Sequence, residues 1–262
     1  MERLFTAIAA ALFGVCIGSF LNVYLFRVPK GENFVTGRSH CMSCGAPIKW
    51  YDLIPVLSYF MLHGKCRNCG SKLSPQYPLV EAMNGIAYAA IAVVYGFSLK
   101  TPLFCLAFSV LVLISAEDVR TFEIPESLNI CLGILGLIAV IIGWPNWGSY
   151  LLGAVSVSGF FLLLLLFSKG KAMGGGDVKL MAAAGLLLGF PNVLFAAVAG
   201  CIIGSVVLLS MKHDQKFREK AAQDPDLPDG AVPFGPFLAG GIFMAMLCAE
   251  PFMNWYLGLF RA

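Results

Sequence analysis

The chain has 262 residues, of which 58% are hydrophobic and only 13% are charged, against about 25% charged residues in an average soluble domain. So little polar surface cannot cover a water-soluble core of this size, which excludes a soluble globular protein. The net charge of +3 is explained by membrane topology and needs no nucleic-acid partner. The composition therefore predicts a protein that contacts membrane lipid and binds no nucleic acid.

Apolar runs of membrane-spanning length recur along the chain, since about 20 residues are needed to cross about 30 Å of hydrocarbon. About eight transmembrane helices are expected, although the third, fourth and sixth are short for a complete crossing: 4–26, 79–97, 102–116, 128–142, 149–167, 178–190, 193–211 and 234–260. The predicted fold class is an all-α polytopic membrane protein. Its predicted parts are a first transmembrane helix (1–26), a cytoplasmic module (27–78) and a multi-helix transmembrane catalytic domain (79–262).

Lys and Arg are distributed unevenly between the two sides of this arrangement. Of the 18 such residues, only Arg3, Lys100 and Arg261 fall on one side. Positive residues in short loops stay in the cytoplasm, so that both termini are expected outside it. The first apolar run extends past the usual length of a signal peptide's apolar region and ends in the segment 22–27 without an Ala-x-Ala cleavage site, so that it is interpreted as a retained helix.

Four of the nine cysteines form two Cys-x-x-Cys pairs in the module, Cys41 with Cys44 and Cys66 with Cys69. This is the spacing of a zinc ribbon, and the glycine that follows each pair permits the backbone turn of such a site. The reducing cytoplasm favours a metal over disulfides, which stay the alternative. Four thiolates would close the coordination shell, so that the predicted zinc has a structural role.

Two aspartates lie beside predicted spans on the same side of the membrane, Asp118 in the segment 117–125 and Asp177 in the glycine-rich segment 174–179. Ionisable residues at such places are functional candidates. Asp177 could simply be a helix N-cap, but Asp118 lies at a helix C-terminus, where the macrodipole disfavours negative charge. Two adjacent carboxylates can share a proton and act as an aspartic protease, with the glycines admitting a substrate backbone.

The segment 174–179 resembles the GxGDxK signature of the type IV prepilin peptidases, which are intramembrane aspartic proteases and N-methyltransferases of the bacterial inner membrane. Other segments are similar to family segments and occur in family order. These are 18–23 with Arg27 and Pro29, the two cysteine pairs, 77–81, 118–125 and 233–237.

This resemblance implies a function and a set of site residues. The family cleaves the leader from type IV prepilins and type II secretion pseudopilins, and then methylates the new N-terminal amine with S-adenosylmethionine. By the same resemblance, Asp118 and Asp177 are the catalytic pair, at a site that faces the cytoplasm. Other residues of the motif support them, namely Gly174, Gly176 and Lys179.

Three further positions carry open questions. The resemblance makes Glu81 a candidate for methyl transfer or for binding the substrate amine, with a carboxylate satisfied inside the helix bundle as the alternative. Lys179 either favours an ionised carboxylate or anchors its helix at the interface. Glu126 stands where many relatives carry Asp. A non-enzymatic or redox membrane protein with a metal-binding cysteine module is the alternative function.

Overall fold

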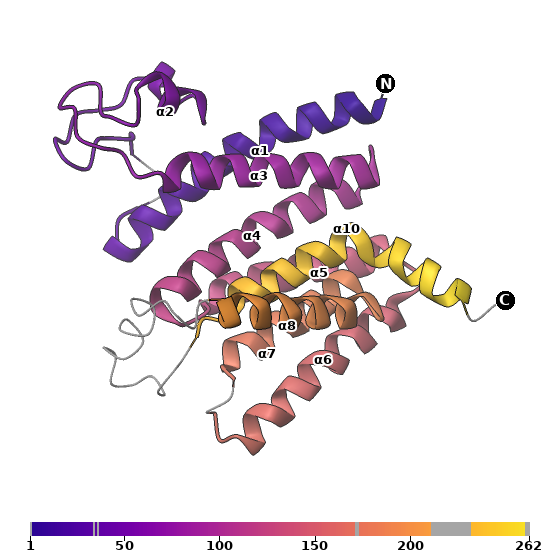
Figure 1. The fold of residues 1–262 in the computed structure, drawn as a ribbon. Coiled ribbons are helices and arrows are strands. Elements are labelled where there is room, and N and C mark those ends of the chain that lie inside the picture. Colours follow the sequence, from indigo (N-terminus) through magenta and orange to yellow (C-terminus); the bar gives the residue numbers. More distant parts are fainter. Residues whose placement is uncertain (1, 34, 36, 171–172, 211–231, 260–262) are drawn as a thin grey trace. The chain divides into compact units, whose positions relative to one another are not determined.

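The computed structural model describes residues 2–33, 35, 37–170, 173–210 and 232–259. Within these residues the chain is all-α, with two isolated β-bridges in the segment between the first two long helices. A helix lies at each of the eight predicted segments (Figure 1). The chain divides into two compact units, Met1–Thr101 and Pro102–Ala262, whereas the boundary predicted from the sequence follows residue 78.

In the first unit, the long helices α1 (Glu2–Arg27) and α3 (Gln76–Tyr95) lie side by side (Figure 1). A Cβ atom built at Gly18 of α1 would lie only 2.7 Å from the Cα atom of Glu81. The side chain of Asn84 donates a hydrogen bond of 2.8 Å to the carbonyl oxygen of Gly14. Small residues and a buried amide therefore bring the two backbones into contact, as is common between membrane helices.

The polar segment between these helices contains the short helices η1 (Val28–Lys30), η2 (Trp50–Leu53) and α2 (Leu57–Met61). Asp52 of η2 accepts hydrogen bonds from both Nε and Nη2 of Arg67, the shortest being 2.7 Å. These bonds hold the pKa of the Asp52 carboxyl below its ordinary value. A bidentate pair of this kind fixes η2 against the second cysteine pair.

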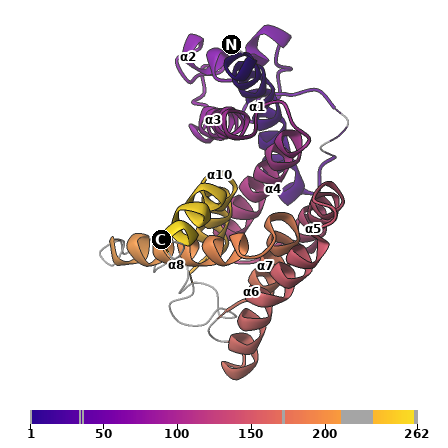
Figure 2. The same ribbon diagram turned by 90° about the vertical axis from the view of Figure 1, so that its right-hand side faces the viewer.

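The second unit is a bundle of helices in which α7 lies between α5 and α6, and α8 packs along α10 (Figure 2). Tight contacts between small residues and backbone join these pairs. The helices are α4 (Lys100–Thr121), which begins two residues before this unit, α5 (Glu126–Ile142), α6 (Trp147–Phe167), α7 (Gly175–Leu188), α8 (Asn192–Ser210) and α10 (Gly235–Leu259).

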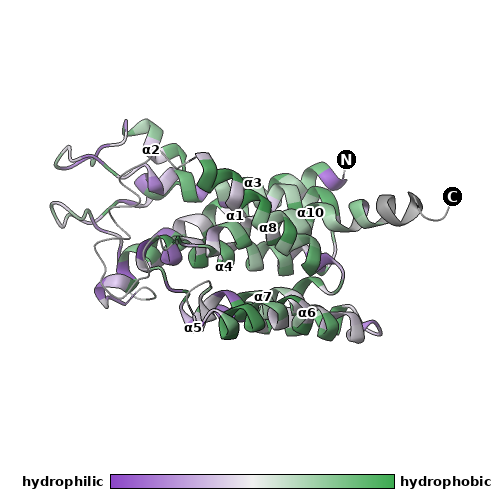
Figure 3. Cartoon of the chain, turned by 60° about the horizontal axis from the view of Figure 1, so that its bottom comes forward, coloured by the Kyte–Doolittle hydropathy of each residue, from purple (hydrophilic) through white to green (hydrophobic). Residues whose placement is uncertain are grey.

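Several helices have the length and hydropathy of membrane spans, so that the protein is a multi-pass membrane protein. Hydrophobic residues cover most of α6 and α8, whereas hydrophilic residues gather in the segment that joins α1 to α3 (Figure 3). The helix α7 has only 14 residues, and α5 and the segment Gly235–Ala249 are shorter apolar helices. Within the described residues, five spans are long and apolar enough to cross a bilayer: Glu2–Lys30, Gln76–Tyr95, Lys100–Thr121, Trp147–Phe167 and Asn192–Ser210.

The third predicted span is longer in the structure than the expected 102–116, because the helix continues through its charged end. Arg120 lies 3.8 Å from the carboxylate of Glu117 one turn earlier. The hydroxyl of Thr121 donates to the carbonyl oxygen of Glu117 at 3.0 Å. These local contacts lie within the last turn of the helix, where hydropathy alone predicts the start of a loop. Asp118 therefore lies within the last turn of α4.

Replacing Gly153 of α6 by Ala is expected to destabilise the second unit. The added Cβ would lie 2.8 Å from the carbonyl oxygen of Gly185 on α7, and overpacking of this kind costs about 1–3 kcal/mol. The measurement is the thermal unfolding midpoint of the purified protein in detergent. Gly159→Ala in the same helix is the matched control, because its Cβ would meet only Val155 at 4.0 Å. Equal midpoints for the two variants would contradict this account of the contact.

Candidate functional site

Asp118 is buried at the C-terminal end of α4, with 5% of its surface exposed. The backbone N–H of Gly235, the first residue of α10, donates a hydrogen bond of 2.8 Å to its Oδ2 atom. The positive end of the α10 dipole therefore faces this carboxylate. The C-terminus of α4 by itself would disfavour negative charge, and the start of α10 compensates for it.

Asp177 is also buried, with 8% of its surface exposed, and it is the third residue of α7. The N-cap of this helix is Gly174, so that the interpretation of Asp177 as an N-cap is wrong. Its carboxylate instead accepts a hydrogen bond from the backbone N–H of Gly174, in the manner of the acidic residue of a capping box. Asp118 and Asp177 are close enough for their charges to interact.

The glycines before Asp177 have different surroundings. A Cβ atom built at Gly174 would meet nothing nearer than the carboxylate of Asp177 at 3.7 Å, so that there is free space at Gly174. A Cβ atom at Gly176 would lie 3.0 Å from Cβ of Ile124. Gly174 thus leaves space beside the acid, whereas Gly176 lets the start of α7 pack closely against the segment before α5.

Lys179 forms an ion pair with Glu126 at the start of α5, and both side chains are more than half exposed. The carboxylate that Lys179 pairs with is therefore that of Glu126, and both roles expected for Lys179 stay predictions. Glu126 stands at the position where an Asp was expected from the family pattern. Its longer side chain reaches Lys179 near the start of α7.

Two contacts at this site were missed from the sequence. Gly235 lies in the segment 233–237, which was singled out only for its resemblance. Asn129 of α5, 6% exposed, donates from Nδ2 to the carbonyl oxygen of Gly176 at 3.4 Å. A lone Asn in an otherwise apolar helix is a signal that could have identified it.

The four cysteines of the two predicted pairs come together in the first unit. The sulfur atoms of Cys41, Cys44, Cys66 and Cys69 all lie within 4.8 Å of one another, and those of Cys41 and Cys69 are 3.9 Å apart. Zn–S bonds of about 2.3 Å in a tetrahedron require sulfur atoms about 3.8 Å apart, so that this cluster fits zinc. The backbone N–H of Cys44 is the main cause that lowers the pKa of the Cys41 thiol to about 6. All nine cysteines are free thiols.

The two cysteine pairs have the same backbone geometry. The N–H of Gly45 donates to the carbonyl oxygen of Cys41 at 2.8 Å, and that of Gly70 donates to Cys66 at 2.9 Å. Both glycines have a left-handed backbone, with φ values of 70° and 71°, which glycine adopts without strain. The expected use of a glycine after each pair is therefore confirmed in the backbone.

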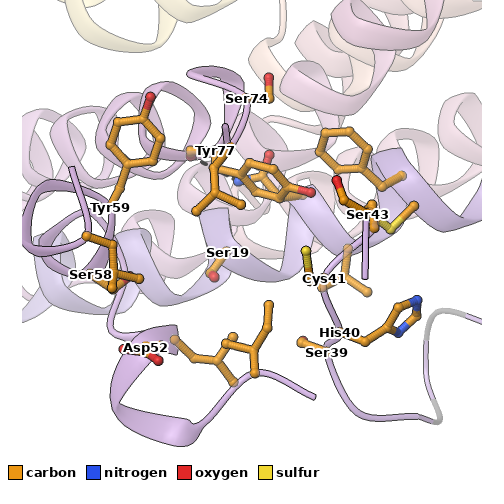
Figure 4. A pocket seen from close by; sticks show the side chains of 18 of the residues that line it. Ser19, Ser39, His40, Cys41, Ser43, Asp52, Ser58, Tyr59, Ser74 and Tyr77 are labelled. Atoms are coloured by element: carbon orange, nitrogen blue, oxygen red, sulfur yellow. Dashed lines mark hydrogen bonds between the residues drawn. The ribbon is translucent and has the colours of Figure 1, made fainter. Parts of the chain in front are cut away.

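A cavity of about 340 Å³ lies between α1, the start of α3 and the cysteine-bearing segment. Ser19, Tyr77 and Cys41 surround it (Figure 4). Glu81 of α3 also lines it and is 7% exposed. The carboxylate of Glu81 accepts a hydrogen bond of 2.7 Å from the backbone N–H of Val56. The candidate carboxylate is thus held by the protein and adjoins a cavity.

Comparison with known proteins finds relatives over most of the chain. Residues 12–95 match the family described as the bacterial peptidase A24 N-terminal domain, and residues 105–209 match the type IV leader peptidase family. The chain is 30% identical to a prepilin leader peptidase/N-methyltransferase of Legionella pneumophila, over 97% of this chain and 95% of that protein. It is 32% identical to one of Neisseria gonorrhoeae (78% and 81%) and 28% identical to one of Bacillus subtilis (94% and 96%). No solved structure matches. The chain therefore belongs to the prepilin leader peptidase/N-methyltransferase family.

Proposed function

We propose that this protein removes the leader peptide from type IV prepilins and type II secretion pseudopilins, and then methylates the new N-terminal amine with S-adenosylmethionine. Its relatives carry both activities in their names. The observation that carries the peptidase assignment is the pair of buried aspartates, Asp118 and Asp177, whose charges interact in the second unit.

The surroundings of the two aspartates support a division of roles in peptide hydrolysis. One carboxylate takes a proton from a water molecule, which attacks the scissile carbonyl carbon, and the other acid protonates the carbonyl oxygen. The N–H of Gly235 holds Asp118, and the N–H of Gly174 holds Asp177. The free space at Gly174 is where the substrate backbone would approach Asp177. Gly176 and Lys179 support the pair by fixing the first turn of α7.

We assign methyl transfer to the cavity of the first unit. Its volume of about 340 Å³ lies within the usual range of small-molecule sites, about 300–1,000 Å³. Phe26 and Tyr77 stack with ring centroids 4.7 Å apart beside it, which offers an aromatic wall. S-adenosylmethionine supplies the methyl group as an electrophilic sulfonium. Glu81 is the carboxylate at this cavity that serves transfer or binds the substrate amine.

We propose that Cys41, Cys44, Cys66 and Cys69 hold a structural zinc ion. All four protein ligands are thiolates, so that no coordination position is left for substrate. The segment that carries them has few buried apolar residues. Metal binding would therefore supply much of its folding free energy.

We place the protein in the bacterial inner membrane with all eight apolar helices spanning it or entering it. The excess of Lys and Arg in the segments 27–78 and 168–179 supports a cytoplasmic position for the cysteine module and the aspartates. Both termini are then outside the cytoplasm. This orientation gives the site access to prepilin leaders, which are positively charged and remain in the cytoplasm.

Mass spectrometry of a prepilin incubated with the purified protein and S-adenosylmethionine tests this function. The expected product lacks the leader and carries one added methyl group. A shortened product without the methyl group would retain the peptidase and remove the transferase. An intact prepilin would favour the alternative, a non-enzymatic or redox membrane protein with a metal-binding module.

Gly235→Ala is expected to slow leader cleavage by roughly 10²-fold, because small displacements of a catalytic group have effects of this size. The added Cβ would lie 2.8 Å from Oδ2 of Asp118 and would push the carboxylate away from its donor. Initial rates of prepilin cleavage measure the effect. Gly240→Ala in the same helix is the control, since its Cβ would meet only Ile203 at 3.5 Å. A rate for Gly235→Ala equal to that of the control would contradict the role given to this contact.

A further inference from the structure

Asn22 is an amide with an unsatisfied oxygen at the cavity of the first unit. It is 1% exposed, it lies in the apolar helix α1, and it lines the cavity. Its Nδ2 atom donates to the carbonyl oxygen of Tyr77 at 3.0 Å, which fixes the orientation of the amide. Its Oδ1 atom has no hydrogen-bond partner. A buried acceptor without a partner is rare and indicates a missing donor.

Glu81 adds a carboxylate on the facing helix. The side chain of Asn22 hydrogen-bonds to the backbone of Tyr77, and Glu81 lies one helical turn after Tyr77 in α3. The side chains of Asn22 and Glu81 therefore line the same part of the cavity, where α1 packs against α3. The hydroxyl of Ser19 also hydrogen-bonds to Glu81. Within the described part of the chain, no Lys or Arg forms an ion pair with Glu81. The charged form of a carboxylate buried at a cavity is costly without a cation, and a bound cation would offset that cost.

The backbone at Val56 shows that Glu81 is held in place. Val56 has φ 62° and ψ −54° in a tight turn, a positive φ that a β-branched residue adopts only under strain. Its N–H is directed to Oε2 of Glu81 at 2.7 Å. Strained backbone persists where the surrounding structure requires it, and often at functional sites. The turn therefore fixes the carboxylate before any ligand enters.

We propose that Glu81 and Asn22 together bind a primary ammonium group in this cavity. An ammonium offers three N–H donors and a positive charge, which match one carboxylate and one unpartnered amide oxygen. The inference rests on the proposed methyltransferase function, which brings two such groups to the cavity. One is the new N-terminus of the cleaved pilin, and the other is the amino group of S-adenosylmethionine.

If the bound ammonium is the new N-terminus of the pilin, Glu81 takes part in the methyl transfer itself. The peptide ammonium gives one proton to the Glu81 carboxylate. The freed lone pair then forms a C–N bond to the methyl group, while the C–S bond breaks and sulfur keeps the bonding pair. The methylated amine takes over the positive charge that the sulfonium loses, and Glu81 returns its proton to water. For the second source, Glu81 and Asn22 bind the donor without proton transfer.

Binding measurements on the full-length, zinc-loaded protein in detergent distinguish these sources. The probes are a peptide with the processed pilin N-terminus and its N-acetylated form, and S-adenosylhomocysteine and its N-acetylated form. Wild-type protein is expected to bind the free amine of one pair at least tenfold more tightly than the acetylated form. Glu81→Gln and Asn22→Leu are expected to lose most of this preference. Glu32→Gln, which changes an exposed carboxylate of the same cavity, is expected to keep it.

Leader cleavage and zinc content report whether each variant is folded, since neither the aspartate pair nor the four cysteines include Glu81 or Asn22. A wild-type preference below about twofold for both pairs would overturn the inference, even where mass spectrometry shows methylation. Equal preferences in wild type, Glu81→Gln and Asn22→Leu would also overturn it. A retained preference in a protein that fails to methylate would instead refute the proposed function and leave the ammonium site.

Discussion

Replacing Asp177 by Asn is expected to abolish leader cleavage, with a loss of about 10³-fold or more. The amide has nearly the same shape and can still accept the hydrogen bond from Gly174, but it cannot take a proton from water. Asp118→Asn is expected to have a similar effect. The double variant is expected to be little worse than either single one, because groups that act as a unit are not additive.

The measurement is the rate of prepilin cleavage, followed by mass spectrometry. The Asp177→Asn variant should still methylate a peptide that already has the processed N-terminus, since the cavity lies in the other unit. Asp52→Asn is the matched control: it removes a carboxylate from the cysteine-bearing segment and should leave cleavage nearly unchanged. Cleavage that survives both Asp118→Asn and Asp177→Asn would refute the aspartic-protease mechanism.

Cys66→Ser is expected to release the zinc ion and to unfold the segment between α1 and α3. Structural zinc sites contribute on the order of 10 kcal/mol to small domains, and three remaining ligands do not provide the same closed shell. Methyl transfer is expected to disappear, because the cavity has Cys41, Met42 and Ser43 in its wall. Leader cleavage is expected to persist at a reduced rate.

Metal analysis and limited proteolysis measure this effect. The variant should contain less than one zinc ion per chain and should be cut rapidly between residues 31 and 74. Cys131→Ser is the control, because Cys131 lies on α5 outside the cluster and is exposed. A Cys66→Ser protein that loses zinc but keeps wild-type protease resistance and methylation would contradict the structural role of the metal.

Helix positions were predictable because length and hydropathy dominate the energetics of a membrane chain. The end of α4 was not predicted, since the pairing of Glu117 with Arg120 and the capping of its last turn are side-chain contacts. The cysteine cluster followed from the spacing of its ligands. Its local backbone turns need only the adjacent glycine, so that no long-range information was required.

Contacts between segments that are far apart in the chain could not be predicted from the sequence. The hydrogen bond from Gly235 to Asp118 joins residues far apart in the chain, and nothing in the apolar pattern of α10 sets the register that produces it. The cavity next to Glu81 depends on how the segment between α1 and α3 folds back onto them. For the aspartate pair and for the cavity, the sequence offers one kind of indication, which is a polar residue in an apolar helix, such as Asn22.

The position of Asp177 in the first turn of α7 determines where the chain tolerates insertions and deletions. The helix is anchored to α6 at Gly185, where the backbones touch. Each residue turns a helix by about 100° and advances it by about 1.5 Å. One residue added between Asp177 and Gly185 would therefore rotate the carboxylate away from Asp118, whereas one added before Gly174 leaves that register unchanged. Between α6 and Gly185, length variation among functional sequences should accordingly occur before Gly174 and not after Asp177.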